Sequence, residues 1–255
     1  MSELLNHKIQ GSGQPVVLIH GLFGSLDNLG LVARGLEEHY QVISLDLRNH
    51  GRSFHRNTHT YQEQAQDVLA LLEHLNIQRC SLVGHSMGGK VAMKIASLAP
   101  QRVEKLAVMD MAPVAYTTHN HDNVFAGLKS VISHQPTSRM AAMALLANSI
   151  EMEGVRQFLS KSMFSDEGII RWRFNVATLL EQYSAIVGWQ PGEPFEQATL
   201  FMKGANSDYI LAEHQSAIAH QFPQAKAHIV ANTGHWLHAE KPQDVIRVLR
   251  RFLQT

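Results

Sequence analysis

The segment Leu82–Lys90, which reads Leu-Val-Gly-His-Ser-Met-Gly-Gly-Lys, constrains the fold of this chain more than any other. Gly84 and Gly88 stand two residues before and two residues after Ser86. An apolar segment comes before this G-x-S-x-G pattern, and apolar and small residues with helical spacing follow it. This order predicts a strand, a very sharp turn that carries the serine, and a helix, because glycine has no Cβ and permits the close approach that such a turn requires. The serine hydroxyl would then lie at a helix N-terminus, where backbone N–H groups and the helix dipole favour negative charge.

Apolar, β-branched segments recur along the chain and alternate with stretches of helical periodicity. Continuous apolar runs of this kind are typical of buried parallel strands. The expected strands are residues 15–20, 41–46, 78–83, 103–109, 198–203 and 227–230, and the expected helices are 26–40, 60–75, 90–96, 210–222 and 243–252. Strands that alternate with helices at this spacing predict an α/β fold, with a mainly parallel twisted sheet and helices on both faces.

The alternation is interrupted between Pro113 and about Ala198, where the periodicities are helical. Helices are expected over Met140–Ile150, Gly154–Met163 and Gly168–Ile186. We therefore expect a helical cap, or lid, inserted after the sixth strand and lying over the carboxyl edge of the sheet. The predicted domains are a core made of residues 1–112 and 196–255 and a cap made of residues 113–195.

Composition excludes several classes of partner. The formal net charge is zero and 17% of residues are charged, which argues against a nucleic-acid partner or an anionic membrane surface. No apolar run approaches the roughly 20 residues that span a bilayer, and the first residues show no secretory signal. Cys80 is the only cysteine, which suits a reducing compartment. The 16 histidines form no recognised metal motif. We expect a cytoplasmic monomer that holds no metal.

His235 is the expected general base. A serine hydroxyl at its ordinary pKa is a poor nucleophile and needs an adjacent base. His235 follows Gly234, beyond the last predicted strand and before the closing helix. This is the position of the base in triads whose chain order is serine, acid, histidine. His85, next to Ser86, is expected to be structural, because adjacent residues on a sharp turn point apart.

Four motifs together resemble the α/β-hydrolase superfamily: His20–Ser25 (HGLFGS), Asp46–Ser53 (DLRNHGRS), Gly84–Gly89 (GHSMGG) and Gly234–Trp236 (GHW). The second and the fourth are similar, more narrowly, to the small bacterial esterases of the YbfF type and their eukaryotic counterparts. The resemblance extends from Pro15 to Phe252 and is weakest in the insertion. It implies the α/β-hydrolase fold and the hydrolysis of carboxylic esters, or of acyl thioesters, without a cofactor.

Two aspartates at strand ends are candidates for the acid that orients His235. Asp208 follows the strand 198–203, where the acid is commonest in hydrolases of this fold, usually in a G-x-x-D loop. Here Ser207 occupies the expected position after Gly204, so Asp208 comes one residue late. Asp110 ends the strand 103–109, from which some members of the fold take their acid. We expect Asp110 to be the acid, with Asp208 as the alternative.

The negative oxygen of a tetrahedral intermediate needs preorganised donors. One is expected from the backbone N–H of Met87, directly after the nucleophile. The other is expected from the loop that follows the first buried strand, where we choose the N–H of Leu22.

The sequence therefore predicts a serine hydrolase that cleaves carboxylic esters, or acyl thioesters such as acyl-CoA, through an acyl-enzyme intermediate. Its partner would be a small-molecule acyl ester or thioester. A dehalogenase or epoxide hydrolase of this fold would carry aspartate in place of Ser86. A C–C bond hydrolase and a cofactor-free haloperoxidase use the same triad and remain alternatives. A non-catalytic protein of this fold that binds a small ligand is the alternative from a different class.

Overall fold

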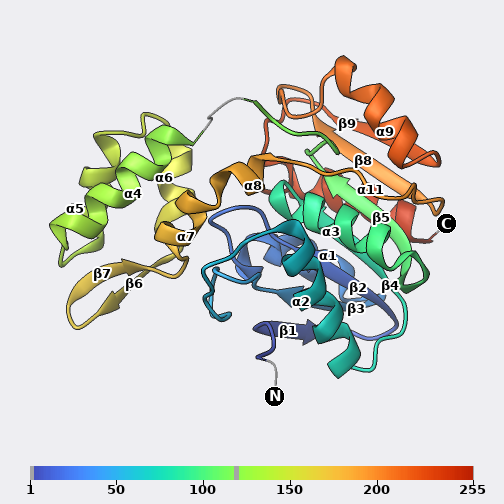
Figure 1. The fold of residues 1–255 in the computed structure, drawn as a ribbon, viewed down its shortest axis with the longest axis horizontal. Coiled ribbons are helices and arrows are strands. Elements are labelled where there is room, and N and C mark those ends of the chain that lie inside the picture. The colour runs from blue at the N-terminus through green and yellow to red at the C-terminus, as the bar shows by residue number, and fades with distance from the viewer. Residues whose placement is uncertain (1–2, 118–120, 255) are drawn as a thin grey trace.

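The computed structural model describes residues 3–117 and 121–254, and it contains a seven-stranded sheet with the order β1-β3-β2-β4-β5-β8-β9 (Figure 1). β1 pairs antiparallel with β3, and all other neighbours are parallel. The strands are β1 (His7–Gln10), β2 (Gln14–Ile19), β3 (Tyr40–Leu45), β4 (Cys80–His85), β5 (Val103–Met109), β8 (Thr199–Gly204) and β9 (Ala225–Val230). The predicted mainly parallel sheet is confirmed.

Helices cover both faces of the sheet and divide the core into two hydrophobic clusters. Alternate residues of one strand enter different clusters, as Leu82 and Val83 of β4 do. One face is covered by α2 (Tyr61–His74), α3 (Met87–Leu98) and α9 (Gln215–Gln221), and the other by α1 (Gly30–Leu36), α10 (Leu237–Glu240) and α11 (Pro242–Gln254). The described residues also contain three short 3-10 helices, at Leu26–Leu29, Pro100–Arg102 and Ala212–His214.

The segment between β5 and β8 forms a group of elements beside the sheet, which Figure 1 shows on the left. It contains α4 (Asp122–His134), α5 (Arg139–Ala147), α6 (Glu153–Ser160), β6 (Met163–Asp166), β7 (Ile169–Trp172), α7 (Val176–Glu181) and α8 (Tyr183–Val187). The prediction that the insertion follows the sixth strand is wrong. The insertion follows β5. Five strands precede it in the described residues, whereas the prediction assumed six. Positions 1, 2, 118–120 and 255 of the predicted core and cap lie outside the described residues.

The prediction of a helix over Gly168–Ile186 is wrong at its start. β6 and β7 form an antiparallel hairpin, and only residues from Val176 onward are helical. Glu167 and Gly168 both have positive φ, at 49° and 80°. Two consecutive residues of positive φ match the right-handed twist of a two-residue hairpin turn. In the sequence, the Glu-Gly pair between two short apolar segments was the feature that could have indicated this hairpin.

The carboxyl ends of β2, β4, β5 and β8 meet at one edge of the sheet, and the turn after β4 lies among them. A Cβ added at Gly84 would lie 2.2 Å from the carbonyl oxygen of Gly88, and one added at Gly88 would lie 2.3 Å from that of Ile19. Only glycine allows α3 to begin this close to β2 and β4. The fold therefore holds Ser86 at the centre of the edge where parallel α/β sheets bind ligands.

Candidate active site

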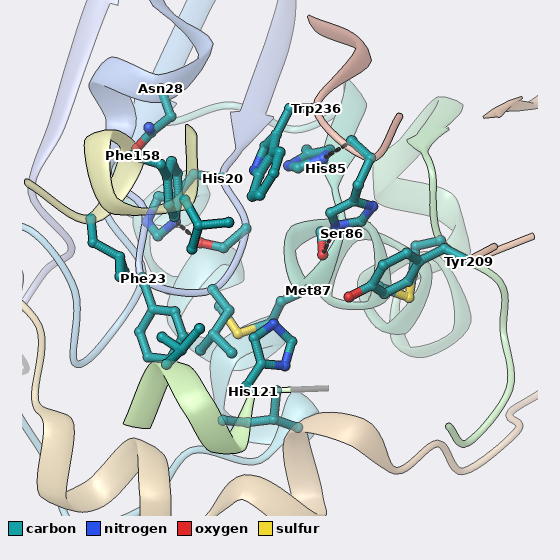
Figure 2. Close-up of a pocket in the computed structure, with 18 of the residues that line it drawn as sticks. His20, Phe23, Asn28, His85, Ser86, Met87, His121, Phe158, Tyr209 and Trp236 are labelled. Atoms are coloured by element: carbon teal, nitrogen blue, oxygen red, sulfur yellow. Dashed lines mark hydrogen bonds between the residues drawn. The ribbon is translucent and has the colours of Figure 1, made fainter. Parts of the chain in front are cut away.

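Ser86 lies on the turn between β4 and α3, in a backbone conformation that residues other than glycine rarely adopt. Its φ is 54° and its ψ is −124°. Its backbone N–H donates to the carbonyl of Met109 at 3.0 Å, which ties the turn to the end of β5. Strained conformations of this kind persist where the surrounding structure over-determines them, and they cluster at functional sites. The turn directs the Ser86 hydroxyl into the cavity (Figure 2).

The structure brings Ser86, His235 and Asp110 together from three different strand ends. His235 Nε2 lies 2.8 Å from Ser86 Oγ, and His235 Nδ1 lies 2.8 Å from Asp110 Oδ2. Asp110 is completely buried and also has a positive φ, of 53°. Because a carboxylate only accepts hydrogen bonds, the proton between these two side chains belongs to Nδ1. Nε2 is then an acceptor that faces the serine hydroxyl.

Asp208 is not brought to His235: among the described residues, the only carboxylate that hydrogen-bonds His235 is that of Asp110. The position where related loops carry their acid is held by Ser207, whose hydroxyl donates to Asp110 Oδ2. The Gly204 N–H donates to the other oxygen, Oδ1, at 3.0 Å. Asp110 therefore accepts three hydrogen bonds. Two of the donors, Gly204 and Ser207, belong to the end of β8 and the loop after it, so this segment holds the carboxylate in place.

Two aromatic neighbours fix the imidazole of His235, and only Tyr209 was not identified from the sequence. Tyr209 stacks on it, with ring centroids 3.8 Å apart and planes 17° from parallel. The N–H of His85 Nε2 donates to the backbone carbonyl of His235 at 2.8 Å. Burial is the main cause that lowers the pKa of His85 well below its ordinary value. A neutral, buried His85 has the structural contact that the sequence predicted for it.

The loop after β2 lies beside Ser86, and this loop and the start of α3 each leave one backbone donor available. Neither the Leu22 N–H nor the Met87 N–H forms a hydrogen bond with the described part of the chain. Phe23, the next residue of the loop, has a positive φ of 62°. Its N–H donates to His50 Nε2 at 3.1 Å. Burial holds the pKa of His50 well below its ordinary value, so this ring is neutral and can accept. His50 therefore anchors the loop that carries the Leu22 N–H.

A cavity of about 590 Å³ opens onto Ser86. It lies between the sheet edge and the inserted elements (Figure 2), and its walls are mainly aromatic and aliphatic. Examples are Phe23, Phe158, Tyr183, Ile186, Tyr209 and Trp236. A predominantly apolar concavity with a few convergent polar groups is typical of small-molecule sites.

Lys90, one helical turn after Ser86, also borders the cavity and has no exposed surface. Its ammonium donates to the carbonyls of Val187 and Gly188, at 3.0 and 2.8 Å, and lies 4.8 Å from the centre of the Tyr116 ring. Within residues 3–117 and 121–254, no carboxylate forms an ion pair with it. Burial lowers the pKa of Lys90 to about 7. This lysine therefore connects the nucleophile helix to the end of α8.

Two further observations concern other classes of site. No cluster of three or more histidine, cysteine, aspartate or glutamate side chains suited to a metal ion occurs in the described ranges. No helix in those ranges is both long and apolar enough to cross a membrane.

Comparison with known proteins places the chain among hydrolases. Residues 14–117 match the family model of the alpha/beta hydrolase fold. The chain is 46% identical to a putative esterase/lipase of Haemophilus influenzae, over 98% of this chain and 88% of that protein. It is 43% identical to the esterase YbfF of Escherichia coli, over 96% of this chain and 94% of that protein. A solved structure of a marine microorganism esterase superposes with a TM-score of 0.95 at 34% identity, covering 98% of this chain and all of that one.

Proposed function

The chain belongs to the α/β-hydrolase family, and on that premise we propose that it is a serine hydrolase that cleaves carboxylic esters through an acyl-enzyme intermediate. The substrate is a small-molecule ester, and acyl thioesters are a second group within the same chemistry. The similar proteins named esterases support this class, and the cavity beside Ser86 supports a small molecule.

One observation carries the proposal: an unbroken chain of hydrogen bonds from Ser86 Oγ through the imidazole of His235 to the buried carboxylate of Asp110. A nucleophile, a base within 2.8 Å and a group that orients the base are the three parts that acyl transfer from serine requires. A protein that only binds a ligand has no need of this alignment.

The reaction proceeds in two halves. Ser86 Oγ attacks the acyl carbon while His235 Nε2 takes its proton, and the carbonyl oxygen becomes an oxyanion that the Leu22 and Met87 N–H groups stabilise. The C–O bond to the alcohol, or the C–S bond to the thiol, then breaks, and His235 returns the proton to the leaving group. A water molecule attacks the acyl carbon of the acyl-enzyme while His235 accepts its proton. The bond between the acyl carbon and Ser86 Oγ then breaks, and His235 gives the proton to Oγ, which releases the acid and restores Ser86. Asp110 stays ionised throughout and stabilises the imidazolium.

Residues 113–195 form the cap of this active site and supply one wall of its cavity. Support comes from cavity-lining residues on α4, α6 and α8. The cytoplasmic location and the monomeric state belong to the same proposal. The single cysteine, which is buried, fits a reducing compartment.

Labelling with a fluorophosphonate ester, followed by peptide mass spectrometry, tests the proposal. We expect rapid modification of Ser86 in the native protein and its loss in His235→Ala. His228→Ala, the same substitution at an exposed histidine of β9, is the matched control and should label normally. A folded native protein that is not labelled would contradict the hydrolase proposal and favour a non-catalytic binding protein.

A further inference from the structure

His121 brings a polar atom from the inserted segment into the cavity of the active site. It immediately precedes α4 and lines the same cavity as Ser86. Figure 2 shows its ring next to Met87, on the side of the cavity away from Trp236. His121 Nδ1 lies 2.7 Å from the hydroxyl of Tyr183. No hydrogen bond joins His121 Nε2 to any of the described residues, so in either tautomer one ring nitrogen remains for a ligand.

The nearest rings around His121 are aromatic. The ring centroids of Phe23 and Tyr183 lie 6.1 and 5.7 Å from that of the imidazole, and both rings are steeply inclined to it. Burial, together with the charge of nearby His235, lowers the pKa of His121 to about 4. The ring therefore stays neutral when His235 takes a proton, and it can exchange a hydrogen bond but not form an ion pair.

We propose that the cavity accepts esters that carry an uncharged hydrogen-bonding group, a hydroxyl or a carbonyl, away from the bond that is cleaved, and that His121 Nε2 binds this group. The proposal rests on the proposed ester hydrolysis and narrows its substrate class. A hydrocarbon chain that fills the cavity would cover Nε2 and leave it without a partner, which is costly, so an ester with such a group gains over its hydrocarbon analogue. A carboxylate on the substrate would be desolvated without a counter-charge from His121, which disfavours it.

Two matched pairs of esters test the proposal, one for each side of the ester bond. Propyl butyrate is compared with 3-hydroxypropyl butyrate, and p-nitrophenyl butyrate with p-nitrophenyl 3-hydroxybutyrate. In the native protein, kcat/KM should favour the hydroxyl compound in at least one pair by about 10-fold, which one ordinary hydrogen bond supplies. In His121→Phe that ratio should fall to about 1, and His121→Gln, which keeps a polar atom, should retain part of it.

The control is His134→Phe, the same substitution at an exposed histidine at the other end of α4, which should leave the ratio at its native value. Thermal unfolding verifies that the variants are folded, and fluorophosphonate labelling of native Ser86 separates the two proposals. If Ser86 is labelled but neither pair discriminates, or discrimination survives in both His121 variants, the inference about His121 is wrong and the hydrolase proposal stands. If native Ser86 is not labelled, the hydrolase proposal fails and the inference falls with it.

Discussion

Replacement of Asp110 by asparagine should abolish most of the activity without disturbing the fold. The carboxylate receives His235 Nδ1–H, the Ser207 hydroxyl and the Gly204 N–H. An asparagine of the same shape can keep its oxygen on the Gly204 N–H and turn its amide toward His235. The amide then donates to Nδ1, which forces the proton onto Nε2, so the imidazole can no longer accept from Ser86.

The expected loss in kcat is on the order of 10⁴, as in other triads with this substitution. It corresponds to about 5 kcal/mol of transition-state stabilisation, at about 1.4 kcal/mol per factor of ten. Asp208→Asn is the matched control and should change kcat less than about threefold, because surface substitutions without a partner have small effects. Steady-state hydrolysis of a p-nitrophenyl ester measures both variants.

The double variant Asp110→Asn/Ser207→Asp tests the geometry further. Position 207 already contacts the carboxylate oxygen that His235 uses, so an aspartate there can reach the imidazole. We expect it to recover about 10- to 100-fold of the lost activity, a partial restoration of the orienting and charge effects of the acid. Near-native activity in Asp110→Asn together with a collapse in Asp208→Asn would refute the assignment of the acid.

The remaining predictions concern the two groups that hold the site from outside the triad. His50→Phe removes the acceptor of the Phe23 N–H and should lower kcat about 10- to 100-fold with little change in KM, because the proposed oxyanion donors would act mainly in the transition state. His50→Gln, which restores an acceptor, should lose less, and equal losses would contradict this role. Burial lowers the pKa of Lys90 to about 7 in the folded protein, whereas an unperturbed lysine has a pKa near 10.4. Above pH 7 the unfolded chain therefore binds more protons than the folded chain, and the free energy of unfolding rises with pH. Urea unfolding between about pH 7 and pH 8.5 should therefore show a rise of up to about 1.4 kcal/mol per pH unit that Lys90→Met lacks; parallel curves would exclude the titration of Lys90.

The parts of the fold that were predicted correctly are those in which the backbone itself demands a residue type. Gly84 and Gly88 are required because a Cβ at either position would collide with backbone oxygens, so the turn that carries Ser86 could be recognised from the sequence. The buried strands were recognisable because both faces of the sheet are covered and their apolar runs are continuous. The position of His235, between the last strand and the closing helix, follows from the same order of elements.

The direction in which side chains point at the strand ends could not be predicted from the sequence. Whether Asp110 or Asp208 reaches His235 depends on loop geometry, including the hydrogen bond from the Asp110 N–H to Met202, which no local pattern encodes. The role of Ser207 was likewise hidden, although its place in the expected G-x-x-D position was visible. The aromatic contact between Tyr209 and His235 joins residues far apart in the chain and depends on tertiary packing.

The inserted segment was the least predictable part because all of its elements except α4 have nine residues or fewer and none is fixed by a parallel sheet. The hairpin of β6 and β7 depends on the left-handed pair Glu167–Gly168, whose signal is easily lost beside helical periodicity. His121 lies in this segment, and its position in the cavity results from packing against Tyr183 and Phe23.

Two properties of the site, the reactivity of Ser86 and the selectivity between esters, depend on different parts of the chain: the first on the core and the second on the insertion. Ser86, His235 and Asp110 all follow strands of the sheet, so their mutual distances depend on strand register and on the glycine-dependent turn. His121 and Tyr183 belong to the insertion, which meets the nucleophile helix through the contact of Lys90 with the end of α8. Substitutions in the insertion can therefore change which esters fit while the hydrogen bonds of the triad stay intact. Reactivity of Ser86 toward a small fluorophosphonate and selectivity between matched esters should vary independently of each other, the first with residues at the strand ends and the second with residues of the insertion.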